Sequence, residues 1–472
     1  MGECLIWSPR EDADFSGFPV NVVTQCGGGV KLLGGSIGNR EVAEMLAQKR
    51  VDKIAAMVDS LELLDDIQLQ YLLLKTCVGL PRFNFQLRVS PPEKIASAIR
   101  SIDDVMYDAI RSLFGSCSLL PEDMDRISFP ISKSGFGIGL AQHTAQPAYV
   151  GSVFHSAQLQ SKLLSSVTSE EALVNHYAPL LSNVNASLPV DKQISTPVLL
   201  ASSEPQHLLS SAMVASRVSA FVASCGTPRE LRVVEAGLKC SNGNWLEAPY
   251  GFDSMDSLSW RCAARFRLGK PIFSQSVPCP SCRREPLDIY GIHATYCNGD
   301  GDCIHRHNAV RDLLIQMCRS AKLPVSDHEP GFLLSDTVSG DKPADVFIRN
   351  WKLGRGLCLD VCIANSLENC NENPSDVLGP LKRKVALKNE KYETRCTERG
   401  FMFKPFVCGS LGGFSDDAVK VMKDIGKSSS AVLGVTKGVA VDHIRKRVAF
   451  AIQKAQATAW IRRGHMADVL LP

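Results

Sequence analysis

Residues 344–363 read ADVFIRNWKLGRGLCLDVCI, and this stretch decides the fold expected for the second half of the chain. Its two ends, 344–348 and 357–363, are rich in β-branched and aromatic residues, and 350–356 between them holds turn-forming residues. The pattern predicts a β-hairpin. If the strands pair symmetrically about the loop, Asp345 faces Asp360 with Cβ atoms roughly 5 Å apart.

Two carboxylates so placed repel each other, and a divalent cation removes that repulsion. The hard oxygen ligands of Asp345 and Asp360 suit Mg²⁺ or Mn²⁺. Such an ion lowers the pKa of a bound water and polarises a phosphodiester. The hairpin alone is equally compatible with aspartates that merely project into water from an edge.

The segment after the hairpin predicts a helix. Ser375 is a candidate N-cap, and the run to Arg399 is rich in helix formers. Lys388 and Tyr392 are four residues apart, so they share one helix face. If that face points at the hairpin, Lys388 would position an attacking water, and Tyr392 would contact the phosphate or simply pack. Lysines on helices are commonly solvated, so the helix alone does not decide between these readings.

A cysteine and histidine cluster precedes the hairpin. Cys279 and Cys282 are separated by two residues, and His293 and Cys297 follow after ten and three more. This spacing suits four ligands around one tetrahedral Zn²⁺ ion, and four protein ligands make such an ion structural rather than catalytic. Three neighbouring side chains are alternative ligands at one of these positions: Cys303, His305 and His307.

The order of these features resembles the restriction-like endonuclease of site-specific non-LTR retrotransposons. That family has a Cys-Cys-His-Cys knuckle, Arg-His-Asn, Glu-Pro, two strand aspartates, and a lysine four residues before a tyrosine. The matching residues are Cys279, Cys282, His293 and Cys297; Arg306, His307 and Asn308; Glu329 and Pro330; Asp345 and Asp360; Lys388 and Tyr392. One departure is Ala344, which separates Pro343 from Asp345 where the family often has Pro-Asp directly; Asp341 lies just upstream.

The resemblance implies roles for these residues. Asp345 and Asp360 would hold Mg²⁺ or Mn²⁺, with Glu329 completing the metal shell. The nick would expose a 3′ hydroxyl on target DNA, and the element RNA is a further expected partner. The Arg-His-Asn residues would hold the DNA backbone or brace their helix.

Upstream segments resemble the reverse transcriptase of the same elements. Residues 29–38 resemble the segment after the palm, 72–88 the helical thumb, 127–139 the turn that follows it, and 265–269 the approach to the knuckle. We find no Tyr-x-Asp-Asp or equivalent pair before residue 29. Because polymerisation needs paired metal-binding carboxylates on a palm, we expect no reverse transcription by this chain alone.

Composition agrees with a multi-part globular protein. A chain of 472 residues predicts roughly three domains, and 45% hydrophobic residues suffice for cores. The net charge of +3 does not by itself indicate nucleic-acid binding. Basic residues gather on a predicted terminal helix with Trp460: Lys437, His443, Arg445, Lys446, Arg447, Lys454, Arg462 and Arg463. That helix is either a basic, partly aromatic face suited to phosphates or a solvated helix.

The 17 cysteines are expected to be reduced thiols and metal ligands. The first residues do not form a signal peptide, and no apolar stretch approaches the roughly 20 residues that span a bilayer. We therefore expect an intracellular, nuclear protein without membrane contact.

The expected fold class is α+β, with a mostly helical N-terminal half, a zinc knuckle and a restriction-endonuclease-like α/β core. The expected segments are a thumb-like remnant at 1–115, a helical connecting region at 116–255, a zinc knuckle region at 256–305, the endonuclease core at 306–415 and basic helices at 416–472. The function expected is metal-dependent nicking of DNA. The alternatives are a catalytically silent, zinc-dependent nucleic-acid-binding module and a decayed retroelement fragment.

Overall fold

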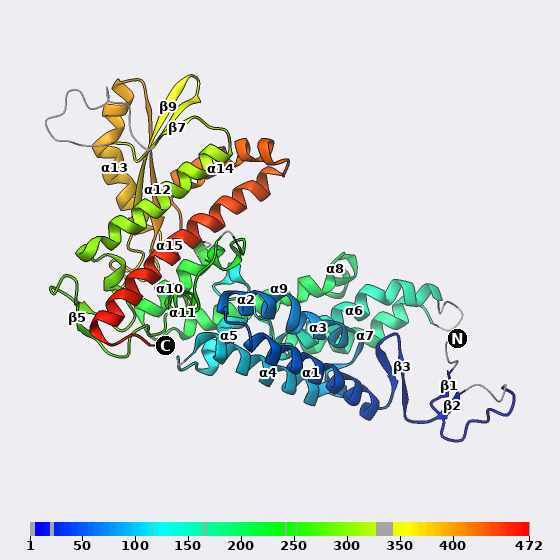
Figure 1. Ribbon diagram of the computed structural model, residues 1–472. Helices are drawn as coiled ribbons and strands as arrows, with labels where there is room; N and C mark the ends of the chain where they lie inside the picture. The colour runs from blue at the N-terminus through cyan, green and yellow to red at the C-terminus, as the bar shows by residue number, and fades with distance from the viewer. Residues whose placement is uncertain are drawn as a thin grey trace. The chain divides into compact units, whose positions relative to one another are not determined.

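The computed structural model describes residues 5–18, 23–115, 117–163, 165, 168–240, 243–251, 253–326 and 343–471 (Figure 1). The chain divides into two compact units. The first comprises Met1–Asp65, Gln70–Leu113 and Ile138–Phe221, and the second comprises Asp66–Leu69, Phe114–Gly137 and Val222–Pro472. Helices predominate and the sheets are small, which confirms the α+β class.

The first unit is mainly helical. Its core includes Phe154 of one helix packed with Leu181 and Leu209 of two others. Its helices and turns, with those that continue into the second unit, are α1 (Arg40–Glu62), α2 (Ile67–Leu73), η1 (Leu74–Val78), α3 (Leu80–Val89), η2 (Pro92–Ile95), α4 (Ala96–Phe114), α6 (Ala141–Leu163), α7 (Glu170–Ala186), η4 (Val190–Lys192), α8 (Thr196–Ala201) and α9 (Pro205–Ser224). Its strands are β1 (Leu5–Ser8), parallel to β2 (Val23–Cys26), and β3 (Gly29–Leu32), antiparallel to β4 (Gly35–Gly38).

The second unit contains the larger sheet. Its helices and turns are α5 (Pro121–Ser128), η3 (Ile131–Lys133), α10 (Pro228–Lys239), η5 (Asn244–Glu247), α11 (Ser257–Leu268), η6 (His293–Thr295), η7 (Gly299–Gly301), α12 (Asp302–Ser320), α13 (Gly379–Glu398), α14 (Asp416–Leu433) and α15 (Lys437–Ala467). Its strands are β5 (Val277–Pro278), β6 (Pro286–Leu287), β7 (Val325–Ser326), β8 (Val346–Lys352), β9 (Arg355–Ala364) and β10 (Met402–Gly409).

The predicted hairpin is present as β8 and β9. Val346 pairs with Leu359, and the turn is Leu353–Gly354. Both turn residues have positive φ, 53° and 74°, as a two-residue type I′ turn requires. The sheet order is β10-β9-β8-β7, and β10 runs parallel to β9 after the crossover through α13.

Alternation along the strands gives the sheet two different faces. Val346, Leu359 and Val361 pack against α12, α14 and α15, whereas Phe347 and Cys358 pack on the side of α13. Figure 1 shows α15, in red, running beside α12 and α14. By this alternation, the side chain of Asp360 belongs to the face that α13 covers.

One predicted helix boundary differs from the structure. The helix expected from Ser375 begins at Gly379, because the side chain of Asp376 accepts the Gly379 N–H (2.9 Å) and Pro380 favours the first helical turn. None of the described helices has both the length and the apolar character needed to cross a membrane.

Candidate functional site

Asp345 directly precedes β8 and lies beside β9. Its N–H donates to the carbonyl of Leu359 (2.8 Å), the residue that pairs with Val346, so the regular register ends at that pair. The Asp345 carboxylate turns toward β9, where its Oδ2 accepts the N–H of Val361 (2.7 Å). The two aspartates are thus brought near each other at the end of the hairpin, although not as a regular cross-strand pair.

Lys388 of α13 meets the second carboxylate. Its Nζ lies 3.0 Å from Oδ1 and 2.9 Å from Oδ2 of Asp360. Asp360 is only 4% exposed, and burial raises the pKa of its carboxyl, an effect that Lys388 opposes and Asp345 reinforces. Both oxygens of the Asp360 carboxylate are therefore within ion-pair distance of the Lys388 ammonium.

His307, near the start of α12, contacts the first carboxylate. Its Nε2 lies 3.0 Å from Asp345 Oδ2, and its Nδ1 lies 3.3 Å from Asn308 Oδ1. The hydrogen bond to Asp345 raises the pKa of the His307 imidazole against the opposing effect of burial. The sequence left open whether His307 binds zinc, contacts DNA or braces its helix. No spacing rule could have paired it with Asp345, because the two residues are 38 positions apart.

Tyr392 and Arg306 lie in packed surroundings. Tyr392 of α13 is buried and packs against Phe347 and Phe403 of the sheet. Arg306 is buried and donates to the carbonyl of Thr295, so its guanidinium is engaged inside the protein. Two acidic residues considered from the sequence, Glu329 and Asp341, lie outside the described residues.

The terminal helix α15 buries Trp460, so the expected basic face lacks its aromatic residue, while its basic side chains range from buried Arg463 to exposed Lys437 and Lys454. Trp460 is fully buried and donates from Nε1 to the carbonyl of Gly291 (2.9 Å). Lys446 pairs with Asp442 (2.7 Å), and Arg447 pairs with Asp253 (2.8 Å). Arg445 is partly exposed. The high count of basic residues in this segment therefore reflects internal ion pairs as well as surface charge.

The Cys/His cluster assembles as the sequence predicts. The ligand atoms of Cys279, Cys282, His293 and Cys297 all lie within 4.8 Å of one another. Among the described residues, these four form a group whose side chains could together hold a metal ion. The two first cysteines lie in the turn between β5 and β6, and His293 lies in η6. Three thiols and one imidazole fit a tetrahedral Zn²⁺ site.

The alternative zinc ligands lie outside this group. Cys303 donates its S–H to the carbonyl of Cys297 (3.3 Å). His305 and His307 are carried away on α12, which starts at Asp302, and His307 is turned toward Asp345. The loop before the histidine ligand is fixed by Asp288, whose carboxylate accepts the N–H groups of Tyr290, Ile292 and His293. The imidazole is thus positioned by its own loop.

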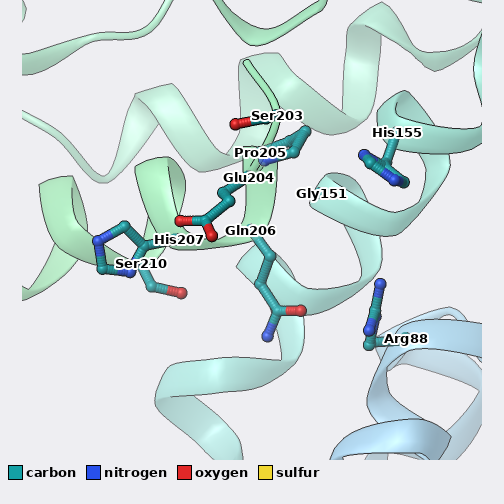
Figure 2. Close-up of a pocket in the computed structure, with 9 residues that line it drawn as sticks. All are labelled: Arg88, Gly151, His155, Ser203, Glu204, Pro205, Gln206, His207 and Ser210. Atoms are coloured by element: carbon teal, nitrogen blue, oxygen red, sulfur yellow. The ribbon is translucent and has the colours of Figure 1, made fainter.

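A separate groove of about 470 Å³ lies in the first unit (Figure 2). Arg88 of α3 and His155 of α6 lie on one side, opposite Glu204 and Gln206 at the start of α9. Gly151 of α6 is required there, because a Cβ at this position would lie 2.6 Å from backbone atoms of Gln206. Arg88, His155 and Glu204 are exposed and of mixed charge, so the groove defines no particular ligand.

No protein-family model and no curated protein matches this chain. The acidic hairpin and the Cys/His cluster are therefore the two sites that bear on function.

Proposed function

We propose that this chain is a metal-dependent endonuclease that nicks DNA and is related to the carboxy-terminal part of non-LTR retrotransposon proteins. The observation that carries the proposal is that Asp345 binds the backbone of Val361, next to Asp360, while Lys388 of the next helix is held against Asp360. The order of the knuckle, the Arg-His-Asn and the hairpin along the sequence supports the relationship.

The two carboxylates suit a hard divalent cation, Mg²⁺ or Mn²⁺. Asp360 is 4% exposed and is paired with Lys388, so a cation would share this carboxylate with the lysine. When bound between Asp345 and Asp360, the cation would polarise a phosphodiester and lower the pKa of a bound water. Glu329 is proposed as a further ligand from the sequence alone.

The remaining side chains would orient the reactants. The Lys388 ammonium has three N–H donors, of which Asp360 takes one or two, so a donor is left for the attacking water or a phosphate oxygen. Tyr392 lies beneath Lys388, with the ammonium 5.7 Å from its ring centroid, and limits the directions that the lysine can take. His307 holds Asp345 in place. Hydrolysis in this arrangement would leave a 3′ hydroxyl at the nick.

A second candidate function is DNA or RNA binding without cleavage. The observation that favours it is that Lys388 and His307 already offset both carboxylates, so the acidic pair has protein partners in the absence of a cation. In that case the hairpin would be an internal ion-pair network, and the Cys/His cluster with nearby basic groups would supply binding.

Nicking of supercoiled plasmid by the purified chain separates these two functions. The wild type is compared with Asp345→Asn and Asp360→Asn in Mg²⁺ and in Mn²⁺, with zinc content measured for each. Asp424→Asn is the matched control, because Asp424 also pairs with a lysine of the hairpin, Lys352, but on the side away from the acidic pair.

The proposal predicts nicking by the wild type and by Asp424→Asn, and none by the two hairpin variants. DNA retention without cleavage by zinc-loaded wild type in both metals would favour the binding module. Equal nicking by all four proteins would assign the activity to another site or to a contaminant.

A further inference from the structure

Arg463 of α15 is a fully buried cation. Its Nη1 forms an ion pair with Asp302 at the start of α12, and its Nη2 donates to the carbonyl of Gly299 (3.3 Å). Charged side chains are almost never fully buried unless they are paired. The position of Arg463 therefore needs an explanation in its surroundings.

Those surroundings are the loop that follows the last cysteine of the Cys/His cluster. The carbonyl of Gly299, two residues after Cys297, accepts from the guanidinium of Arg463. The N–H of the same Gly299 donates to Cys297 Sγ (3.4 Å). Arg463 thus holds the residue whose backbone N–H contacts the sulfur of the last cysteine.

Two adjacent arginines of α15 hold the segment that follows Cys297. Arg462 pairs with Asp300 (3.4 Å) and Asp302 (2.7 Å), and Arg463 pairs with Asp302 as well. Ion pairs therefore tie the start of α12 to α15 beside the metal-binding loop.

We propose that Arg463 is a positioning residue of the Cys279, Cys282, His293 and Cys297 metal site. It orients the Cys297 thiolate from outside the ligand set, through Gly299, and it couples metal occupancy to the docking of α15. Hydrogen bonds from such surrounding groups tune metal affinity. This inference depends on the zinc assignment and is independent of nuclease activity.

The effect of metal binding on α15 should extend to the sheet, because α15 packs both on the metal site and on the sheet. Trp460 and Ala457 of α15 pack in the core that contains Cys279 and Cys297. Val448 and Ile452 of the same helix pack in the core that contains Leu359 of β9. Loss of the metal should therefore loosen α15 as a whole and not only the knuckle.

The test compares the full chain with Arg463→Met and Arg463→Lys. Arg232→Met is the matched control, because Arg232 is 1% exposed and donates only to carbonyls, among them those of Pro374 and Ser366. Two quantities are measured: zinc affinity by competition with a chromogenic chelator, and the thiolate-to-metal charge-transfer absorption of the Co²⁺-substituted protein. Limited proteolysis within α15, with and without a strong zinc chelator, reports docking.

We expect Arg463→Met to weaken zinc binding by roughly 10- to 100-fold and Arg463→Lys to fall between it and the wild type. The charge-transfer band should move to lower energy in Arg463→Met, since thiolates without hydrogen bonds give up charge more easily, and stay unchanged in Arg232→Met. Chelation should speed cleavage of α15 in the wild type.

Several results would overturn the proposal. Unchanged zinc affinity and cobalt absorption in Arg463→Met would remove the positioning role. An equal loss of zinc in Arg232→Met would show that general destabilisation explains the effect. If Arg463→Met does not fold, Arg463→Lys decides, and a wild-type cobalt spectrum in that variant rejects the proposal. Unaltered proteolysis of α15 after chelation would reject the coupling.

Discussion

His307 Nε2 and Asp345 Oδ2 lie 3.0 Å apart and join the start of α12 to the start of β8. The same oxygen accepts the Val361 N–H, so the first carboxylate of the hairpin is held from two sides. Its orientation is set by the protein before any ligand arrives. Preorganised ligands of this kind bind with less loss of side-chain freedom.

Replacing His307 should remove one of the two hydrogen bonds that orient the Asp345 carboxylate and should leave zinc binding unchanged. If the endonuclease proposal holds, His307→Ala should raise the Mg²⁺ concentration needed for half-maximal nicking by roughly 10- to 100-fold. His307→Gln, whose amide can donate to the same oxygen, should recover part of the loss. A Mg²⁺ titration of plasmid nicking measures the effect, and an unchanged midpoint in His307→Ala would show that Val361 alone positions Asp345.

Removing Lys388 should lower the free energy of unfolding, because the buried Asp360 carboxylate would lose its ion-pair partner. Lys388→Met leaves a carboxylate that is 4% exposed without its cation, and we expect the free energy of unfolding to fall by about 1–3 kcal/mol. Adding Asp360→Asn should restore much of it. Urea unfolding of the two single variants and the double variant in Mg²⁺-free buffer gives the coupling. Strictly additive losses would mean that the ion pair contributes nothing to stability.

Arg126, like Arg463 and Arg232, is a buried arginine whose guanidinium donates to backbone carbonyls, but it lies away from the proposed sites. It donates to the carbonyls of Leu268 (3.0 Å) and Arg267 (2.9 Å) and to Ser134 Oγ (3.1 Å). Arg126→Met leaves these acceptors without their donor and should cost about 2–4 kcal/mol of unfolding free energy. Arg126→Lys should recover little, because one ammonium cannot reach acceptors arranged for a planar fork. Equal stability of the Lys variant and the wild type in urea would contradict this account.

Asp103 of α4 should make the first unit less stable as the pH rises. Its carboxylate accepts the N–H groups of Ala141 (2.6 Å) and Gln142 (2.8 Å) at the start of α6, yet burial raises the pKa of Asp103 more than these bonds lower it. The folded state therefore holds this proton more tightly than the unfolded state. The stability contributed by Asp103 is full below the unfolded pKa and is lost as pH rises through the folded pKa.

The comparison that isolates this effect is Asp103→Asn, which cannot ionise. The unfolding free energy of the wild type minus that of Asp103→Asn should decline between acid pH and neutrality. Thermal or urea unfolding at several pH values measures the difference. A difference that stays constant or increases over this range would mean that the helix N–H groups outweigh burial.

Local patterns predicted the parts of this fold that depend on neighbours in the sequence. The pattern in 344–363 predicted the hairpin and its pairing up to Val346 and Leu359, and the spacing of Cys279, Cys282, His293 and Cys297 predicted the cluster. Each depends on a short loop whose geometry is nearly fixed by its residues.

Other features arise only from packing between distant segments. The contact between His307 and Asp345 depends on where α12 crosses the sheet, and the burial of Arg463 depends on the knuckle that receives it. Charge counting suggested an exposed face at the end of the chain because it cannot tell a paired cation from a solvated one. The inward orientation of Trp460 follows from two cores that meet along one helix.

The crossover through α13 sets the order in which the acidic site forms during folding. The hairpin closes over a two-residue turn, so Asp345 and Asp360 can meet as soon as residues 344–364 have been synthesised. Lys388 arrives later, because α13 docks fully only when β10 has paired in parallel with β9, a slower and less local step. For that interval the two carboxylates face each other without their lysine. If Mg²⁺ binds the two carboxylates as proposed, it would offset their repulsion during that interval and so favour formation of this sheet.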